Sequence, residues 1–485
     1  MMRSARLLFP DLRAGPAGGF QQQEDRIRSC LRLGVGGFIL FGGSARAVTE
    51  LTRRLRSESA HPILIGADLE RGAGQQFAGL ASFPPLAALG ALNDLEVLHE
   101  AGRLTAAEAR SVGVDWVYAP VADLAVEPNN PIVGTRSFGP DPETVARQVA
   151  AWVLGCHAGG ALACAKHFPG HGRTTTDSHI GLPVVHAESL ADDLIPFAAA
   201  IEAGVSTVMT AHVAFPALDP SGAPATLSRP ILTHLLRGRM GYEGLVVSDA
   251  MNMAGVAGAG GEQLAGVRAV AAGVDALLHP ADPAGLAVVL GAADPDTLSR
   301  ARLENALERV ARAAEKAAAL VPGDTTGARA WADATAERVV TTLRGRPPAL
   351  TGVRVLVRTV DDDVGGPFPA PSRDPFTAAL RRAGVTVSEA AAREDGELTV
   401  LAVYCEPRGW KGRAGLSADS VRGVHDALEE DPAALVVLFA HPRLAAAVPG
   451  GSHLVAAWGG EAVMQAAAAV RLAVGCGNSS PDSIV

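Results

Sequence analysis

Short apolar runs, each closed by glycine, proline or a polar residue, alternate with segments of helical periodicity from the N-terminus to His279. This alternation predicts consecutive βα units and a parallel sheet. The runs that we interpret as strands are Arg6–Phe9, Gly36–Phe41, Pro62–Ala67, Val114–Pro120, Leu162–Lys166, Thr207–Ala211, Leu245–Ser248 and Asp275–His279. The segments between them that we interpret as helices are Gln21–Leu33, Ala45–Ser57, Asp94–Val112, Asp141–His157, Glu188–Ala203, Arg229–Met240 and Glu262–Ala272. Such a series of parallel βα units most economically closes into an eight-stranded barrel.

The pattern changes after His279. Two further helices are expected at Asp294–Leu320 and Trp331–Leu343, and the Pro- and Gly-bearing stretch 321–352 is expected to connect two domains. The strands predicted beyond it are Val353–Val357, Val385–Ser388, Leu398–Val403, Leu435–Ala440 and His453–Trp458, and the helices are Pro375–Gly384, Ser417–Glu430 and Gly460–Leu472. The predicted fold is therefore α/β, with an N-terminal TIM-type (β/α) barrel over residues 1–320 and a smaller C-terminal α/β sandwich domain over residues 353–485.

Composition narrows the class of protein. The chain has 485 residues, 48% of them hydrophobic and 19% charged, which is typical of a globular protein. The formal net charge of −9 and the absence of a Lys/Arg run disfavour a nucleic-acid partner. Apolar stretches are too short to span a membrane, and the first residues do not form a signal peptide. Five scattered cysteines without a CxxC pair fit reduced thiols. We expect a cytoplasmic protein, monomeric or homodimeric, with neither a nucleic-acid nor a membrane partner.

Polar side chains gather where the predicted barrel strands end. They are Asp68, Lys166, His167, His212 and Asp249, with Arg136 in the loop after the fourth strand and Asp177-Ser178-His179 in the loop after the fifth. Barrels of this type carry their chemistry at this end. A single Asp after a strand is usually a helix cap, and a single Arg is usually a surface residue. Convergence of so many charged and imidazole groups on one rim instead predicts a functional site, because burying unpaired charge costs free energy.

Two chemistries fit this rim poorly. A metal hydrolase would take its ligands from His167, His171, His179, His212 and either Asp177 or Asp249. The His-x-His or HExxH spacing that fixes two imidazoles on one element is missing. A phosphate-binding isomerase or aldolase could use Lys166 for a Schiff base, but only His279-Pro280 follows the last strand, where a Gly-rich phosphate loop is expected. We therefore expect no metal and no cofactor.

Glycosyl transfer is the third chemistry. It needs one carboxylate to attack the anomeric carbon and a second group to give and take the leaving-group proton. Asp249 can be the first group. The second can be His179, an imidazole oriented by Asp177 two residues earlier in place of an ordinary carboxyl group.

The run Lys166–Gly172 (KHFPGHG), the trailing Asp177-Ser178-His179, the loop Asn130–Phe138 and the block Ser248–Met251 together resemble glycoside hydrolase family 3, in its β-N-acetylglucosaminidase branch. The resemblance covers the barrel and, more weakly, the second domain. It implies hydrolysis of terminal non-reducing β-linked N-acetylglucosamine, for example from peptidoglycan fragments, with retention of configuration and without metal.

The resemblance also implies roles for single residues. Asp249 matches the nucleophile that forms a covalent glycosyl-enzyme, and His179 matches the acid/base with Asp177 as its partner. The residues that match the substrate-binding set are Asp68, Arg136, Lys166, His167 and His212, with Gln76 at the position of a sugar-contacting Arg. Because Gln replaces that Arg, a broader β-glucosidase specificity stays open. A histidine acid/base would not repel phosphate, so a β-N-acetylglucosaminide or β-glucoside phosphorylase also stays open. A non-catalytic sugar-binding protein would not need Asp177, His179 and Asp249 together.

Overall fold

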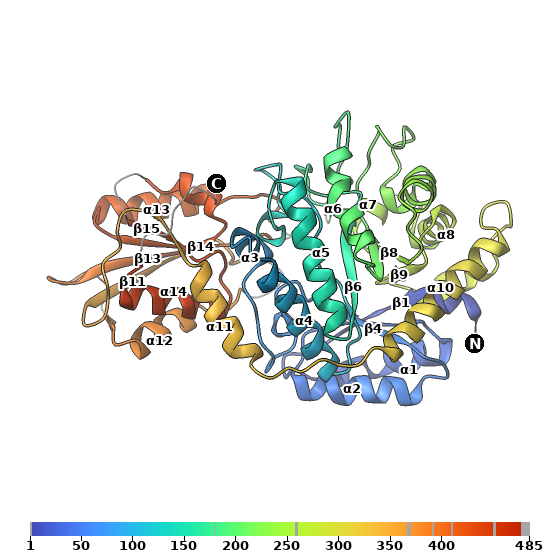
Figure 1. Cartoon of the computed structure of the whole chain (residues 1–485), viewed down its shortest axis with the longest axis horizontal. Coiled ribbons are helices and arrows are strands. Elements are labelled where there is room, and N and C mark those ends of the chain that lie inside the picture. The colour runs from blue at the N-terminus through green and yellow to red at the C-terminus, as the bar shows by residue number, and fades with distance from the viewer. Residues whose placement is uncertain are drawn as a thin grey trace. The chain divides into compact units, whose positions relative to one another are not determined.

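The computed structural model describes residues 2–178, 180–257, 260–365, 370–389, 392–408, 411–449 and 453–476. The chain forms two compact units, whose elements are labelled in Figure 1. Unit 1 comprises Met1–Ala81, Asp94–Glu127 and Gly139–Thr326, and unit 2 comprises Ser82–Asn93, Pro128–Phe138 and Gly327–Val485. Two short excursions of the first part of the chain thus belong to unit 2.

Unit 1 is built on a parallel sheet in the order β1-β9-β8-β7-β6-β5-β4-β3-β2. The strands are β1 (Leu8–Phe9), β2 (Asp11–Arg13), β3 (Gly37–Phe41), β4 (Leu64–Ala67), β5 (Trp116–Val117), β6 (Leu162–Phe168), β7 (Thr207–Thr210), β8 (Leu245–Ala250) and β9 (Ala276–Leu278). Only Pro10 separates β1, which pairs with β9, from β2, which pairs with β3. The two short strands therefore fill one barrel position between them, and the predicted eight-stranded barrel is confirmed.

Most helices of unit 1 follow the predicted segments closely. They are α1 (Glu24–Leu33), α2 (Ala45–Glu58), α4 (Leu95–Ser111), α5 (Pro142–Ala158), α6 (Ala191–Glu202), α8 (Glu262–Ala272) and α10 (Arg300–Ala319), with a π-helix at Pro230–Arg239. The helix α9 (Pro283–Gly291) was not predicted. Ser44, Asp94 and Asp141 accept hydrogen bonds from the first turns of α2, α4 and α5. Such caps satisfy amide groups that have no partner within the helix. No helix among the described residues is long and apolar enough to cross a membrane.

Unit 2 contains a six-stranded sheet in the order β10-β15-β14-β13-β11-β12. Its strands are β10 (Thr341–Arg344), β11 (Arg354–Asp361), β12 (Thr386–Val387), β13 (Leu398–Cys405), β14 (Leu435–Ala440) and β15 (His453–Ala456). Its principal helices are α3 (Leu86–Ala91), α11 (Ala328–Val339), α12 (Asp374–Arg382), α13 (Ala418–Glu430) and α14 (Ala462–Val474). All strand pairs are parallel except β10–β15.

Alternate residues of the central strand β13 face two separate apolar cores of unit 2. Val400, Ala402 and Tyr404 join the core that α11, α12 and α14 cover. Leu401 and Val403 join the core that α13 covers. Successive side chains of a strand point to opposite faces, so helices lie on both faces of the sheet. The predicted α/β sandwich is confirmed.

One predicted element is wrong in part. The helix expected at Trp331–Leu343 ends at Val339, and the next residues form β10, the only antiparallel strand among those described in the second sheet. The run Val339-Val340-Thr341-Thr342 is entirely β-branched. Such residues lose side-chain freedom in a helix and pack well in a strand.

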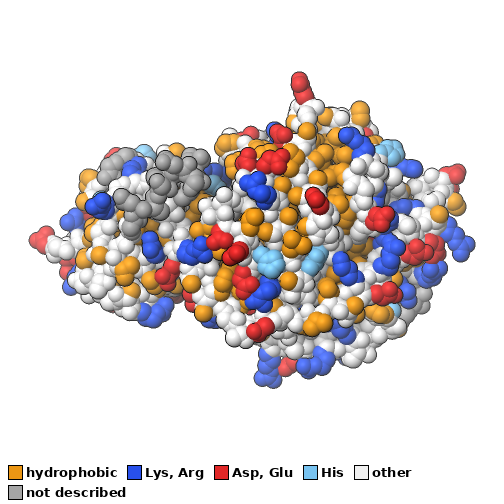
Figure 2. Space-filling model, in the orientation of Figure 1, with side chains coloured by type: hydrophobic (Ala, Val, Ile, Leu, Met, Phe, Trp, Pro, Cys, Tyr) orange, Lys and Arg blue, Asp and Glu red, His pale blue; other side chains and the backbone are white. Residues whose placement is uncertain are grey.

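Charged side chains of both signs lie on the surface among apolar and uncharged ones. On the face shown in Figure 2, Lys and Arg are interspersed with Asp and Glu. This distribution agrees with the modest net charge of −9. The five cysteines are all buried and free.

Candidate active site at the mouth of the barrel

Lys166, near the end of β6, lies between two carboxylates. Its Nζ is 2.8 Å from Asp68 Oδ1 and 2.7 Å from Glu70 Oε1. The Lys166 side chain is 2% exposed, whereas that of Asp68 is 29% exposed. A buried ammonium group needs carboxylate partners to offset the loss of its hydration. Asp68 is the most exposed member of this group.

The two strands that end in candidate site residues are both irregular at that end. The register between β6 and β7 shifts between Ala165 and Phe168, and that between β8 and β9 shifts between Val247 and Ala250. At the second irregularity the Ser248 hydroxyl accepts a hydrogen bond from the backbone N–H of Leu278. Bulges of this kind re-aim side chains and are enriched beside active sites. They release Lys166-His167 and Ser248-Asp249 from regular pairing.

Asp123, in the loop after β5, orients two histidines. Its Oδ2 accepts a hydrogen bond from His167 Nδ1 (2.7 Å), and its Oδ1 accepts from the backbone N–H groups of His167 (3.1 Å) and His171 (2.7 Å). Burial opposes ionisation of this carboxyl, but the charge and hydrogen bond of His167, followed by His171, outweigh it and lower the pKa of Asp123. The carboxylate therefore keeps the proton of His167 on Nδ1 and leaves Nε2 for other contacts.

The His171 ring holds together the loop that follows β6. Burial, and then the charge of His167, lower its pKa to about 4, so the ring is neutral at pH 7. The Thr174 hydroxyl donates to the His171 carbonyl (3.0 Å) and so accepts from His171 Nδ1 (2.8 Å). His171 Nε2 is then the acceptor for the Ser178 hydroxyl, at 3.1 Å. A neutral imidazole thus holds the residue that lies between Asp177 and His179.

Asp249 is the penultimate residue of β8 and is partly exposed. Its Oδ1 accepts a hydrogen bond from the backbone N–H of Ala250 (2.7 Å). The Ala250 carbonyl accepts from His212 Nε2 (3.0 Å), and His212 Nδ1 is 2.7 Å from Thr226 Oγ1. His212 is fully buried. The negative charge of Asp249 also acts on His171 and His279, opposing the lowering of their pKa by burial. These interactions bring the end of β8 together with the ends of β6 and β9.

The other predicted site residues are placed as follows. Asp177 is 1% exposed, and its backbone carbonyl accepts from the N–H groups of Ile180 and Gly181. His179, the predicted acid/base, lies outside the described residues. Arg136 is the last residue of the 3₁₀ turn Gly134–Arg136 and belongs to unit 2.

Gln76 has a structural contact of its own. Its Oε1 accepts a hydrogen bond from the backbone N–H of Gly42 (3.1 Å) and so links the loop after β4 to the loop after β3. Gln76 is partly exposed. The side chain that stands at the family position of a sugar-contacting Arg is therefore tied to the neighbouring loop.

Sequence reasoning missed two members of this site. Glu70 completes the pair of carboxylates on Lys166, and its only signal was its place two residues after Asp68. Asp123 orients His167 and His171 from 44 and 48 residues away, and a single Asp after a predicted strand gave no sign of it. Neither residue could be predicted from the sequence, because Lys166, His167 and His171 are all far from it along the chain.

The chemistry available at this mouth is that of carboxylates, imidazoles and one ammonium group. Within the described residues, no three His, Cys, Asp or Glu side chains are grouped so that they could hold a metal ion. Asp249 in β8 offers a partly exposed carboxylate, Asp68 after β4 offers an acceptor, and His167 in β6 offers an imidazole nitrogen. Such a set can hold hydroxyl groups of a polar ligand and attack an electrophilic carbon.

Comparisons with known proteins agree with one another. Residues 7–313 match the model of the glycosyl hydrolase family 3 N-terminal domain. A beta-hexosaminidase of Xylella fastidiosa (strain M23) is 42% identical over 240 residues, which are 47% of this chain and 70% of that protein. A beta-hexosaminidase of Chromobacterium violaceum is 38% identical over 290 residues, 57% of this chain and 80% of that protein. The solved structure of a glycoside hydrolase family 3 beta-N-acetylglucosaminidase from Paenibacillus sp. str. FPU-7 is 29% identical with a TM-score of 0.84, and the match covers 97% of this chain and 96% of that chain.

Proposed function

The chain belongs to glycoside hydrolase family 3, and from that premise we propose that it is a retaining exo-β-N-acetylglucosaminidase. The family predicted from the sequence is confirmed, and the protein is a glycoside hydrolase. The narrower activity is supported by relatives named beta-hexosaminidase and by the two-domain beta-N-acetylglucosaminidase structure. The observation that carries the proposal is the carboxylate of Asp249 at the end of β8, on the same rim as the Lys166 cluster.

In this proposal Asp68, Lys166 and His167 bind the hydroxyls and the N-acetyl group of the terminal sugar. Asp68 Oδ1 is held by Lys166, and its partial exposure leaves it open to a sugar hydroxyl. His167 Nδ1 is held by Asp123, so Nε2 is the ring nitrogen that is left to contact a sugar hydroxyl. Arg136 completes the binding set, as the family resemblance implies.

Two further residues of the binding set act in the proposal through the backbone. Gln76 holds Gly42, and His212 holds the carbonyl of Ala250 beside Asp249. Both contacts fix loops or strand ends from which other side chains reach the ligand. In the proposal, Gln76 and His212 therefore assist substrate binding by positioning the residues that contact the sugar.

The proposed reaction has two steps. In the first, an oxygen of the Asp249 carboxylate attacks the anomeric carbon, and the departing glycosidic oxygen takes a proton from His179. In the second, His179 takes a proton from water, the water oxygen attacks the anomeric carbon, and Asp249 is released. Two displacements at one carbon retain its configuration. Asp177 orients the imidazole in both steps and stabilises its protonated form, in the role that the resemblance gives it.

A panel of aryl β-glycosides tests the activity. We expect the N-acetylglucosaminide to be cleaved much faster than the glucoside and the xyloside, with the β-anomer of the sugar formed first in ¹H NMR spectra. A fluorinated aryl glycoside that slows the second step should label the peptide containing Asp249, as seen by mass spectrometry. First formation of the α-anomer would contradict a covalent intermediate.

Replacing His179 tests the acid/base. His179→Ala should slow cleavage of substrates with poor leaving groups far more than cleavage of activated aryl substrates, because only the former need a proton on the departing oxygen. Equal losses on both kinds of substrate would contradict this role. The same assay with added phosphate distinguishes hydrolysis from phosphorolysis, since only a phosphorylase forms the sugar 1-phosphate.

The natural substrate in this proposal is a small carbohydrate, a peptidoglycan fragment that ends in β-linked N-acetylglucosamine. The proposed location is the cytoplasm, which the five free cysteines support. Incubation with purified muropeptides and detection of free N-acetylglucosamine tests the substrate, and cell fractionation tests the location.

A further inference from the structure

The loop that carries Arg136 leaves unit 1 at Glu127 and returns to it at Gly139. The backbone N–H of Ala125 donates to the Gly139 carbonyl (2.9 Å) and closes the base of this excursion. Between these points, residues 128–138, here called the Arg136 loop, belong to unit 2. Its packing is therefore set by contacts within that unit, of which three stand out.

The first contact is at the end of the loop. A Cβ added at Gly90, in α3, would collide with the backbone carbonyl of Phe138. Only glycine permits this approach of helix and loop. Two neighbours of Gly90 in the same helix, Ala87 and Ala88, belong to the apolar core that α11, α12 and α14 share. Through α3, the end of the loop rests on the core of unit 2.

The second contact is at Gly134, two residues before Arg136. A Cβ at this position would lie 2.7 Å from Pro407 Cγ, and the glycine has a φ of +37°. Both features restrict the position to glycine. The backbone of the Arg136 loop thus lies directly against the segment that follows β13.

The third contact is at the start of the loop. The Asn130 carbonyl accepts a hydrogen bond from Arg443 Nη2 (3.4 Å). Asn130 is buried, with 1% of its surface exposed. Its side-chain Oδ1 accepts hydrogen bonds from the backbone N–H groups of Ile132 (2.9 Å) and Val133 (2.7 Å). Asn130 thereby orders the turn that leads to Gly134, and the hydrogen bond from Arg443 stabilises that turn.

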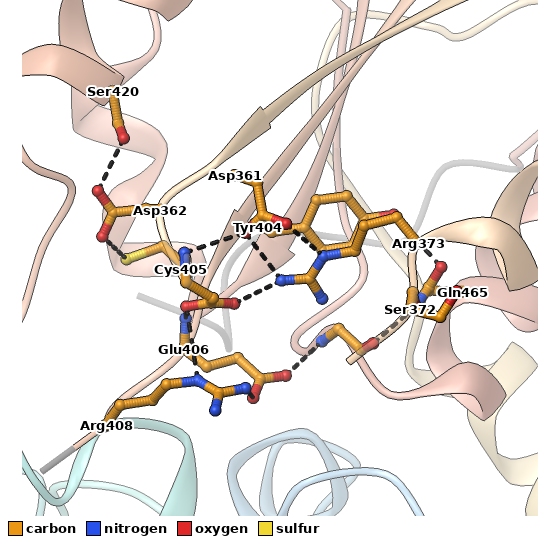
Figure 3. Close-up of polar contacts among 12 residues, drawn as sticks. Asp361, Asp362, Ser372, Arg373, Tyr404, Cys405, Glu406, Arg408, Ser420 and Gln465 are labelled. Atoms are coloured by element: carbon orange, nitrogen blue, oxygen red, sulfur yellow. Dashed lines mark hydrogen bonds and ion pairs between the residues drawn. The ribbon is translucent and has the colours of Figure 1, made fainter. Parts of the chain in front are cut away.

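A buried ion cluster keeps Pro407 in place. Asp363 Oδ1, at the end of β11, accepts from the backbone N–H of Glu406 (2.9 Å) and from Lys411 Nζ (2.6 Å), so Pro407 is held on both sides. The Asp363 and Lys411 side chains are 0% and 1% exposed. Figure 3 shows Arg373 facing Asp361 beside the ring of Tyr404, and Glu406 in the same network. Charges that are buried and paired in this way resist displacement.

We propose that unit 2 fixes the Arg136 loop, and that Arg443, Pro407 and Gly134 are positioning residues for sugar binding by Arg136. Residues of unit 2 outside the Arg136 loop then take part in sugar binding without contacting the sugar themselves. This inference rests on the sugar contact proposed above for Arg136. A side chain misplaced by about 1 Å can cost on the order of 100-fold in rate, so a loop held at three points is functionally significant.

Kinetics of the full-length chain test the link to sugar binding. Arg443→Ala should raise KM for an aryl β-N-acetylglucosaminide about fivefold, the usual effect of one lost hydrogen bond. Gly134→Ala should raise it more, on the order of 100-fold. Neither should change kcat as much as KM. In an Arg136→Ala background, Arg443→Ala should cause no further loss. Arg422→Ala, which removes an exposed ion pair of the same unit with Asp419, is the matched control and should behave as wild type.

Hydrogen exchange tests the fixation itself, independently of activity. Amides of residues 128–138 should exchange faster in the Arg443→Ala and Gly134→Ala variants than in wild type or Arg422→Ala, at unchanged melting temperature. Unchanged exchange in both variants overturns the proposal. Faster exchange with unchanged KM, or losses that add to those of Arg136→Ala, overturns its link to sugar binding. A wild-type KM for Arg136→Ala instead contradicts the sugar contact in the proposed function. In that case hydrogen exchange of residues 128–138 still tests whether unit 2 fixes the Arg136 loop.

Discussion

Each unit buries one lysine between two carboxylates near the carboxyl ends of parallel strands. In unit 1, Lys166 lies 2.8 and 2.7 Å from Asp68 and Glu70. In unit 2, Lys411 lies 3.2 and 2.6 Å from Asp362 and Asp363. Both lysine side chains are at most 2% exposed. By burial and charge alone the two clusters are nearly alike, and each lies where α/β proteins usually bind ligands.

The clusters differ in what closes them. Around Lys411, Arg413 and Arg373 supply further charges to the carboxylates, and Ser420 donates to Asp362, whose side chain is 1% exposed. Around Lys166, Asp68 remains 29% exposed. Buried charge therefore marks a candidate site only where one of the carboxylates that hold the lysine stays open to solvent, because carboxylates that the chain itself buries and neutralises are a structural support. Matched substitutions in the two units test this distinction.

The largest contrast is expected from the carboxylates. Asp249→Asn should lower kcat on the order of 10⁴-fold or more, because the nucleophile is lost, while the melting temperature stays near that of wild type. Asp363→Asn should cost about 3 kcal/mol of stability, because it removes one of the two carboxylates that pair with each of the buried cations Lys411 and Arg373, and should leave kcat within about twofold. Initial rates on an aryl β-N-acetylglucosaminide and thermal melts measure both. A large fall in kcat for Asp363→Asn would break the comparison.

The lysines give the next contrast. Lys411→Met should lower the free energy of unfolding by about 3 kcal/mol, and any kinetic effect should be confined to KM through the Arg136 loop. Lys166→Met should lower kcat/KM on the order of 100-fold, because Asp68 and the sugar lose a fixed charge. Urea unfolding and steady-state kinetics separate the two. If both variants lose the same stability and neither changes kcat/KM, Lys166 is as structural as Lys411.

His171 of unit 1 and Asp362 of unit 2 should contribute to stability in different pH windows. The pKa of His171 is lowered to about 4 from its ordinary 6.5, so the unfolded chain binds the extra proton between these values. Stability must then fall as pH decreases from 6.5 to 4, by about 3 kcal/mol for this group. For Asp362 burial is outweighed by hydrogen bonds from Ser417, Ser420 and Arg413, which hold its pKa far below 3.8. Its stabilisation is complete above pH 4 and is lost only below it.

His171→Asn tests the first window. The variant should show a smaller loss of stability between pH 6.5 and 4.5 than wild type in urea titrations, with the remaining slope set by other buried histidines such as His157. Ser420→Ala should leave that window unchanged. An identical pH slope in His171→Asn and wild type would show that His171 does not titrate there.

The smallest effects are expected from two serines. Ser178→Ala removes the hydroxyl that His171 accepts from, so kcat for substrates with poor leaving groups should fall about fivefold as the acid/base loop loosens. Ser420→Ala removes a donor to Asp362 and should cost about 1 kcal/mol with kcat unchanged. Steady-state rates and melts on both variants measure these effects. A fall in kcat for Ser420→Ala with an unchanged kcat for Ser178→Ala would contradict the assignment of the active site to unit 1.

Local patterns in the sequence predicted most elements of the fold. Runs such as Leu162–Lys166 and Leu245–Ser248 correspond to β6 and β8, and the caps Asp94 and Asp141 begin α4 and α5 as expected. These features depend on a few adjacent residues, so they can be recognised without the fold. The helix predicted to reach Leu343 ends at Val339, because residues 341–344 pair with β15 as a strand. Local sequence alone did not decide between helix and strand there.

The sequence by itself determined the family, the barrel with its second domain, and the rim on which Asp68, Lys166 and Asp249 lie. Only the tertiary structure decided which groups these residues meet. It placed Asp123 on His167, Glu70 on Lys166, and the Arg136 loop within unit 2. The physical reason is range. Propensity and periodicity act over one turn or one strand, whereas the position of a charge depends on partners that only packing of the whole chain brings together.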